Sequence, residues 1–325
     1  MGGSVRKKFR DKFTDPNLIK KINNLENSPQ MQEKLNSIKK QMKSKTFDPI
    51  YTISSLGIFG IILAIFIFLF FGRYILIILI VGWEFISKFF KKRKIDVGKL
   101  YANNFLLPIL ENILPNTKIN YFEGIKYEII KNIFSDFEKY YSNCHIIFGD
   151  DYKTEFSNLQ IFHYVENSEG NNRKVYDYMG QILVSNLKTN IDGHIRIVPV
   201  VDKNLFGYKK YGIYNKKFKD EEEIETEYID FNETYSIFST DEFYTRLVLN
   251  PNIMEILNKW KDKMRVSIYM NEKYISISFE SNENLFYLPS TKTEIDELSL
   301  AGEYEKVSEK LADFYGLIDK ISEKL

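Results

Sequence analysis

A long apolar block near the beginning of the chain constrains the fold more than any other feature of the sequence. The residues from Ile53 to Phe71 include no charged side chain, and a second apolar run extends from Tyr74 to Trp83. A transmembrane helix needs roughly 20 mainly apolar residues to cross about 30 Å of hydrocarbon. The first run is long enough by itself, so the sequence predicts an integral membrane protein.

The block is too long for a single crossing, and this length predicts a helical hairpin. One helix over residues 53–90 would be about 57 Å long at about 1.5 Å per residue, with Arg73 near its middle. A turn at Gly72 and Arg73 instead brings the arginine to the headgroups. The sequence therefore predicts two transmembrane arms, at 52–71 and 74–90, within a membrane segment over residues 51–90.

Basic residues flank the block on both sides and predict its orientation. Lysines cluster from Lys39 to Lys45 before it, and basic residues from Lys88 to Lys94 follow it. Because such clusters stay on the cytoplasmic side, both ends are expected there, and only an even number of crossings allows this. We expect a multi-pass protein of the bacterial inner membrane with both termini in the cytoplasm.

Glu84 is the one carboxylate inside the block. In the hairpin it lies about 15 Å from the turn at helical rise, well inside the second arm. A carboxylate at that depth is expected to be protonated, paired or facing protein, which makes it a functional hypothesis. Beside Trp83 it would instead sit at the membrane interface if the arm inserts obliquely. Both interpretations stay open at this point.

Composition limits the remaining possibilities. The 45 basic and 44 acidic residues nearly cancel, so there is no overall positive field to attract nucleic acid. The single cysteine, Cys144, excludes an intramolecular disulfide and is expected to be a small core residue. The basic start near Arg6 runs into a long polar stretch, so we expect no cleaved signal peptide.

Residues 1–50 are predicted to be a cytoplasmic region of short amphipathic helices. Asp15-Pro16 and Ser28-Pro29 each have the pattern of an N-cap followed by proline at the first helical position. In the second helix one apolar stripe is formed by Met31, Leu35, Ile38 and Met42. This stripe is expected either on the anionic inner leaflet or against the soluble part of the protein.

Residues 95–290 are predicted to form a soluble α+β domain with a mostly antiparallel sheet. Helical periodicity covers Val97 to Leu114, with Pro108 as a kink or break, and then Tyr121 to Tyr140. Afterwards the period changes to two, and segments rich in β-branched and aromatic residues predict strands. These strands are Phe156 to Glu166, Val175 to Leu187, His194 to Val201 and Tyr228 to Phe238.

The rest of the chain adds helices and a hairpin. Asp241 or Thr240 is expected to cap a short helix, and Pro251 to open another that ends at Trp260. The stretch from Arg265 to Phe279 alternates on both sides of a short polar turn and predicts a β-hairpin. In residues 291–325 an amphipathic helix is predicted by a stripe of Val307, Leu311, Phe314, Ile318, Ile321 and Leu325.

Three stretches follow the order of features of a known family. The hairpin is followed by a segment from Tyr101 that leads into a proline-containing turn. Phe156 to Glu166, and then Tyr178-Met179-Gly180, are similar to a strand pair that usually carries Phe-x-Gly in its second member. Phe231 to Leu257 carries a similar strand, Ser-x-Asp turn, helix and Leu-x-Pro step. The chain thus resembles the bacterial domain of unknown function 3137 family, which implies a membrane hairpin before an α+β domain but no activity.

No pattern of catalytic, cofactor-binding or metal-ligating residues is found. Phosphate-binding loops are absent, and Cys144, His145, His163 and His194 lack metal-ligand spacing. The loop from Lys203 to Lys219 interleaves lysines with aromatic residues, a pattern that can bind single-stranded nucleic acid. An acidic run from Asp220 follows, however, and would oppose phosphate. We therefore interpret the loop and the acidic run as solvated faces, and we assign no site residue, cofactor or nucleic-acid partner.

Three hypotheses for function remain. The favoured one is a non-enzymatic, membrane-anchored cytoplasmic binding or scaffold module whose partners are the lipid bilayer and an unidentified protein. The second is an enzyme at the inner leaflet, in which Asp150, Asp151 and a histidine assemble a site that spacing does not reveal. The third is an accessory subunit of a transport or channel complex, which depends on Glu84 alone.

Overall fold

The computed structural model describes residues 9–47, 84, 87–88, 91–92, 94–134, 137–166, 170, 172–203, 209–214, 217–261, 264–281 and 285–323. Nearly all of the predicted transmembrane hairpin, with arms at 52–71 and 74–90, lies outside these residues. Within the described part of the chain, no helix is both long and apolar enough to cross a membrane.

The chain divides into two compact units. The first, called here the sheet unit, comprises Met1–Ile19, Leu110–Tyr287 and Tyr304–Leu325. The second, called the helical unit, comprises Lys20–Ile109 and Leu288–Glu303. The domain boundaries expected at residues 50, 90 and 290 stay predictions.

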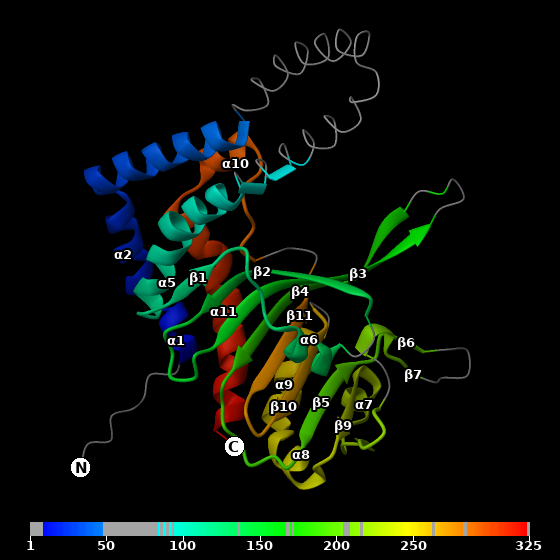
Figure 1. Cartoon of the computed structure of the whole chain (residues 1–325). Helices are drawn as coiled ribbons and strands as arrows, with labels where there is room; N and C mark the ends of the chain where they lie inside the picture. Colours follow the sequence, from blue (N-terminus) through cyan, green and yellow to red (C-terminus); the bar gives the residue numbers. More distant parts are fainter. Residues whose placement is uncertain are drawn as a thin grey trace, which may run out of the picture. The chain divides into compact units, whose positions relative to one another are not determined.

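The sheet unit is built on a nine-stranded sheet in which every pairing is antiparallel, so the predicted α+β class is confirmed (Figure 1). The strand order is β1-β2-β3-β4-β11-β10-β5-β9-β8. Their bounds are β1 (Lys118–Asn120), β2 (Lys139–Ile147), β3 (Glu155–Glu166), β4 (Asn172–Ser185), β5 (His194–Pro199), β8 (Glu222–Ile224), β9 (Tyr235–Ser239), β10 (Val266–Asn271) and β11 (Ile275–Glu280). A separate two-stranded sheet joins β6 (Asp202–Lys203) to β7 (Lys209–Lys210).

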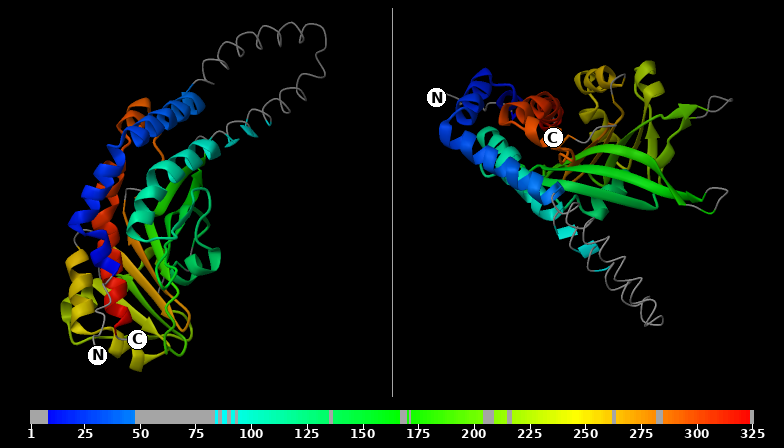
Figure 2. Two further views of the ribbon diagram at one scale, coloured as in Figure 1. Left: turned by 90° about the vertical axis from the view of Figure 1, so that its left-hand side faces the viewer. Right: turned by 90° about the horizontal axis from the view of Figure 1, so that it is seen from above.

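Helices cover the two faces of the sheet differently (Figure 2). One face carries the short α6 (Tyr127–Ile133) and the 3-10 turn η2 (Gly212–Tyr214). On the other face lie α9 (Pro251–Trp260) and the long α11 (Leu300–Ser322). This unit also contains α1 (Phe9–Phe13), α7 (Ile229–Thr234) and α8 (Glu242–Val248).

The sequence signals for α8, α9 and α11 are confirmed. The Asp241 side chain accepts a hydrogen bond from the Tyr244 N–H at the start of α8. Asn250 caps α9 and Pro251 occupies its first turn, where a missing N–H costs nothing. On α11 the predicted stripe is buried from Val307 to Ile321, and Phe314 stacks on Phe279 of β11 with ring centroids 3.7 Å apart. The predicted hairpin is β10 and β11.

The prediction of one helix over Tyr121 to Tyr140 is wrong. Of the described residues in this range, those of α6 alone are helical, and β2 begins at Lys139. The segment of β2 is rich in aromatic and β-branched residues, and its pairing with β3 outweighs the helical spacing before it. A register shift follows Asn143, and Cys144 has a positive φ of 59° at this irregularity.

The strand predicted from Tyr228 to Phe238 is also partly wrong, because α7 precedes β9 (Tyr235–Ser239). Local hydrogen bonds favour the helical turn. The Asn232 amide donates to the Thr226 carbonyl at 2.7 Å and accepts from the Thr226 N–H at 3.0 Å. Such side-chain bonds to nearby backbone groups compete with strand formation.

The helical unit contains α2 (Pro16–Glu26) from Lys20 onward, helices over 29–47 and 94–101, a π-helical turn η1 (Ala102–Leu106) and α10 (Lys292–Glu297). Leu35 and Met42 are buried, so the predicted stripe packs within the protein. The helix does not break at Pro108. Instead η1 lies just before it, and the Leu107 N–H donates to the Ala102 carbonyl five residues earlier as α5 (Leu107–Ile113) begins.

Candidate functional site

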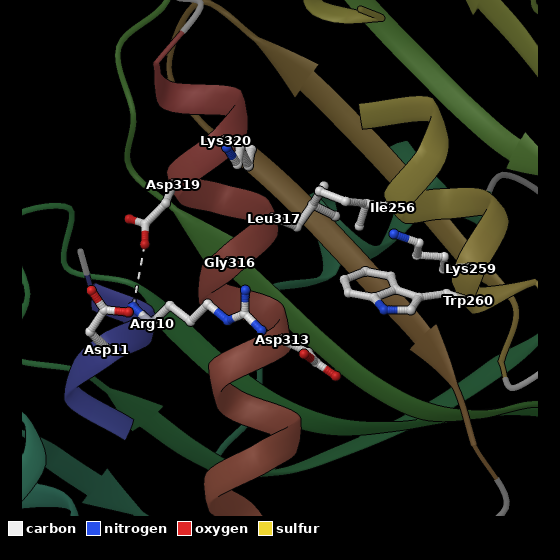
Figure 3. Close-up of a pocket in the computed structure, with 10 residues that line it drawn as sticks. All are labelled: Arg10, Asp11, Ile256, Lys259, Trp260, Asp313, Gly316, Leu317, Asp319 and Lys320. Atoms are coloured by element: carbon white, nitrogen blue, oxygen red, sulfur yellow. Dashed lines mark hydrogen bonds between the residues drawn. The ribbon is translucent and has the colours of Figure 1, made fainter. Parts of the chain in front are cut away.

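A pocket of about 430 Å³ lies where α1, α9 and α11 meet (Figure 3). All of its lining residues belong to the sheet unit. They divide into a small apolar group and a charged rim. The residues are Arg10, Asp11, Ile256, Lys259, Trp260, Asp313, Gly316, Leu317, Asp319 and Lys320.

The apolar wall comes from helix periodicity on α9 and α11. Ile256 and Trp260 are four residues apart on α9, so they lie on one face of that helix and flank Leu317 of α11 (Figure 3). Trp260 packs edge-on against Phe279 with ring centroids 5.5 Å apart. The indole is therefore held in place from behind while part of it faces the pocket.

The rim carries charges of both signs. Three cationic side chains and three carboxylates contribute: Arg10, Lys259, Lys320, Asp11, Asp313 and Asp319. The Arg10 backbone N–H donates to Asp319 Oδ2 at 3.3 Å, which ties α1 to α11 (Figure 3). Lys259 pairs with Glu255 on its own helix at 2.7 Å. The rim therefore has no single preferred sign, in contrast to a site built for phosphate.

Gly316 lets the Arg10 side chain lie close to α11. A Cβ at this position would come within 3.1 Å of Arg10 Cδ, closer than ordinary van der Waals contact. In Figure 3 the Arg10 side chain extends across the helix at Gly316 toward Asp313. A glycine inside a helix costs about 1 kcal/mol relative to alanine. The close approach of Arg10 gives that glycine a structural reason.

This arrangement can hold a group that is apolar at its tip and charged at its base. Apolar contacts with Trp260 and Leu317 would exclude water, and the rim would satisfy charges of either sign. Among the described lining residues there is no serine, threonine, cysteine or histidine that could act as a nucleophile or imidazole base. The titratable groups of the pocket are carboxylates and cationic side chains.

The structure does not bring the three histidines together. Each pairs with its own carboxylate: His145 with Glu155 at 2.7 Å, His163 with Asp177 at 2.8 Å, and His194 with Glu221 at 2.9 Å. Within the described residues, no group of three potential ligands could hold a metal ion. Cys144 is fully buried, which confirms it as a core residue, and burial raises the pKa of its thiol.

Asp150, considered for an enzymatic site, stabilises a turn instead. Its buried carboxylate accepts a hydrogen bond from the Thr154 N–H at 2.8 Å and another from the Tyr315 hydroxyl at 2.6 Å. Asp151 is exposed. Tyr315 belongs to α11, so Asp150 fastens the turn before β3 to that helix.

A buried ion pair between β5 and the acidic run was not foreseen from the sequence. Glu221 was interpreted as part of a solvated face, but it and Arg196 are both buried. The guanidinium donates to the two Glu221 oxygens at 2.9 and 2.7 Å and to the Tyr214 carbonyl at 2.7 Å. Phe218 lies over the guanidinium at 4.2 Å and donates its N–H to Glu221 at 2.6 Å.

The surroundings of Glu221 keep it ionised. Burial by itself would raise the pKa of its carboxyl. Glu221 accepts hydrogen bonds from His194, Arg196 and a backbone N–H. These hydrogen bonds and the positive charge of the guanidinium together outweigh burial and lower that pKa to about 2. The buried ion pair of Arg196 and Glu221 thus holds the segment from η2 to β8 against β5.

The aromatic residues of the loop from 203 to 219 belong to this covering layer where they are described. Tyr211 and Tyr214 are buried in the core cluster beside α6, and the Tyr211 hydroxyl lies 3.0 Å from Ser236 Oγ. Side chains buried in this way are not exposed for base stacking. The aromatic character of Tyr211 and Tyr214 could have suggested from the sequence that they are buried, but not which residues they contact.

Comparison with known proteins identifies a family for the C-terminal part of the chain. Residues 176–322 match the family described as Protein of unknown function (DUF3137). Over these residues the chain is similar to the DUF3137 family, as its sequence pattern indicated. The DUF3137 match runs from within β4 to the end of α11, and so includes every pocket residue except Arg10 and Asp11. No curated protein and no solved structure matches the chain.

Proposed function

We propose that this chain is a binding module anchored in the bacterial cytoplasmic membrane by a helical hairpin, and that the pocket between α1, α9 and α11 receives part of a protein partner. The family description names no activity, so the proposal rests on the sequence and the geometry. Both chain ends are placed in the cytoplasm, in accordance with the basic clusters beside the apolar block.

The anchor is supported by an ion pair between the two ends of the apolar block. Lys45 Nζ lies 2.9 Å from Asp96 Oδ2, and both residues belong to the helical unit. A single crossing of the block would separate these positions by about 30 Å of hydrocarbon. Two crossings return the chain to its starting side, and the closeness of Lys45 and Asp96 supports this arrangement.

The contact of Glu84 favours an anchor over a transport subunit. Glu84 pairs with Lys88 at 2.8 Å, one helical turn later. Lys88 begins the basic cluster that follows the block, and such a side chain reaches the headgroup region. A carboxylate paired in this way has a partner in its own helix, which supports the interfacial interpretation of Glu84.

The binding role depends chiefly on one observation, the partly exposed Trp260 in a preformed pocket with a charged rim. Tryptophan is enriched among the residues that dominate binding energy at protein interfaces. Leu317 and Ile256 beside it offer apolar contact, and the mixed rim matches the polar edge that surrounds such anchors. The best-fitting occupant is an apolar side chain of a partner with charged residues next to it.

The anchor is tested by topology and extraction. Reporters fused after residues 45 and 325 of the full chain should both report the cytoplasm, and the protein should stay in membranes after alkaline carbonate washing. Reporters on opposite sides would replace the hairpin by a single span. Release by carbonate would remove the anchor altogether.

The pocket is tested by site-specific photo-crosslinking in cells that express the full chain. A photoreactive residue at Lys320, on the rim, should give a protein adduct of defined mass that Trp260→Ala removes. The matched control is Phe243, 72% exposed on α8 and outside the pocket, which should give no such adduct. Equal adducts from both positions, or an adduct insensitive to Trp260→Ala at normal membrane levels, would contradict the proposal.

An enzyme at the inner leaflet is the second candidate. The observation in its favour is that Asp313 and Asp319 share the pocket with three cationic side chains. A small substrate would leave no protein adduct at Lys320. Binding would then be sought by thermal shift of the purified full chain with metabolite fractions, and Asp313→Asn with Asp319→Asn should remove any shift.

A further inference from the structure

Strands β3 and β4 continue beyond the rest of the sheet as a two-stranded ribbon (Figures 1 and 2). They pair as far as Glu166 with Asn172. On one side β2 accompanies β3 only to Phe162, and on the other side β11 accompanies β4 only from Gly180. Residues 172–178 of β4 therefore have β3 along one edge and no other strand of the described chain along the second.

An open strand edge is a template for a further strand, because its outward N–H and C=O groups are not used within the sheet. Proteins often blunt such an edge with charges, with proline or with a β-bulge. The sequence from Asn172 to Tyr178, NRKVYDY, has no proline and has charges of both signs, and its register with β3 shifts only near its inner end, at Asp177. Positive residues stand before Val175 and a negative residue stands after it.

We propose that this edge pairs antiparallel with the same edge of a second copy of the chain, with the two Val175 residues opposite each other. In a two-fold antiparallel pair each residue faces the residue at the mirrored position. Lys174 then faces Tyr176 of the second copy, and Arg173 faces Asp177. Each unlike pair occurs twice, and opposite charges across strands stabilise pairing while like charges oppose it.

The side chains of the ribbon already stand in suitable positions. Lys174 Nζ lies 3.7 Å from the Phe162 ring centroid and 4.4 Å from that of Tyr176, so it is held on the aromatic face. The half-exposed Tyr176 ring of a second copy would extend this stack. On the opposite face Asp177 uses Oδ2 for His163, and its other oxygen can accept Arg173 of the second copy.

Other registers lose this match. Moving the centre to Tyr176 sets Asp177 opposite Val175 and Lys174 opposite Tyr178, so the Arg173 charge meets no carboxylate. Moving it to Lys174 sets Arg173 opposite Val175. Moving the centre by one residue shifts each partner by two positions and leaves every side chain on its own face. The match of charges therefore selects the register centred on Val175.

The register is tested by a cysteine at the symmetry centre. Val175→Cys in the full chain, in membranes, should form a disulfide-linked dimer on mild oxidation, because opposed Cα atoms lie about 4.5–5.5 Å apart. The native Cys144 is fully buried and should stay silent. Val165→Cys, on the outer strand of the same ribbon, is the control. Across two intervening strands its counterpart would be more than about 14 Å away, beyond disulfide reach.

A charge swap tests the pairing itself. In the Val175→Cys background, Arg173→Asp or Asp177→Arg alone opposes like charges twice and should slow dimer formation by about two- to thirtyfold. The combined swap restores unlike pairs and should recover the original rate to within about twofold. Arg173 is exposed, so Arg173→Asp should leave the fold intact. Asp177→Arg also removes the contact with His163, an effect that Arg173→Asp does not share.

Three results would overturn the proposal. They are a Val175→Cys dimer that forms no faster than the Val165→Cys dimer, a combined swap as slow as the single substitutions, and a disulfide to a different protein in place of the dimer. The anchor and the pocket are tested on other residues, so failure here is distinguishable from failure of the proposed function.

Discussion

The two faces of the nine-stranded sheet are covered by different physical means. On the face of α9 and α11, one long helix with a regular apolar stripe supplies the cover, and Phe314 stacks directly on Phe279. On the face of α6 the helix has 7 residues, and much of the cover is irregular chain from η2 to β8. That chain is fastened by the buried pair of Arg196 and Glu221.

The comparison shows what a sheet face needs when no long helix covers it. A helical stripe buries apolar surface and satisfies its own backbone, so it needs no further polar partner. Irregular chain must find partners for its backbone groups. Here the Arg196 guanidinium donates to the Tyr214 carbonyl, and the Glu221 carboxylate accepts from the Phe218 N–H. Charged groups are therefore structural on one face, whereas on the other they surround the pocket.

The largest expected effect comes from breaking the buried pair on one side. Arg196→Ala leaves an ionised Glu221 in the core and should lower the free energy of unfolding by about 3–5 kcal/mol, measured by urea denaturation of the full chain in detergent. Replacing both partners, Arg196→Met with Glu221→Leu, removes the uncompensated charge and should cost less than the single change. A double variant less stable than Arg196→Ala would mean that the backbone partners, not the charge, dominate.

On the sheet face covered by α9 and α11, called here the helical face, the corresponding change is Phe314→Ala. Phe314 is 2% exposed and its ring stacks on Phe279, so truncation leaves a cavity between α11 and β11. We expect a loss of about 3 kcal/mol in the same denaturation experiment. Phe314→Leu should lose less, because it fills most of the cavity. Equal losses for both variants would indicate that the aromatic stack, rather than filled volume, stabilises this face.

The sequence predicted the helical face far better than the other. Periodicity and caps gave α9, α11 and the hairpin of β10 and β11, because each depends on neighbours within a few residues. Arg196 and Glu221 are 25 residues apart, and Arg10 and Asp319 of the pocket are 309 apart. No local sequence pattern encodes such pairs, so the buried ion pair and the pocket became visible only in the structure.

Lowering the pH should reduce the free energy of unfolding through Glu221 on one face of the sheet and not through Phe314 on the other. This effect is smaller than those of the substitutions above. The pKa of Glu221 is lowered from its ordinary 4.5 to about 2, so its stabilising contribution is complete above about pH 4.5 and is lost as pH falls toward 2. Over that range one proton should change stability by at most about 1.4 kcal/mol per pH unit. Glu221→Gln should flatten this slope, measured by urea denaturation at several pH values, whereas Phe314→Ala should leave it unchanged.

The smallest expected effect concerns Gly316, where the helical face meets the pocket. Gly316→Ala gains about 1 kcal/mol of helix propensity, and its Cβ meets only the flexible Arg10 side chain at 3.1 Å. If that side chain moves, stability should stay equal or rise by up to about 1 kcal/mol in the denaturation experiment.

The cost of moving Arg10 can be isolated with a second substitution. In an Arg10→Ala background nothing meets the new Cβ at this distance, so Gly316→Ala should show the whole gain of about 1 kcal/mol. The difference between the two backgrounds measures how firmly Arg10 is held across α11. A loss of stability with Arg10 present, and a gain without it, would show that Arg10 is fixed in place, and the charges of the pocket would then be structural like those of the opposite face.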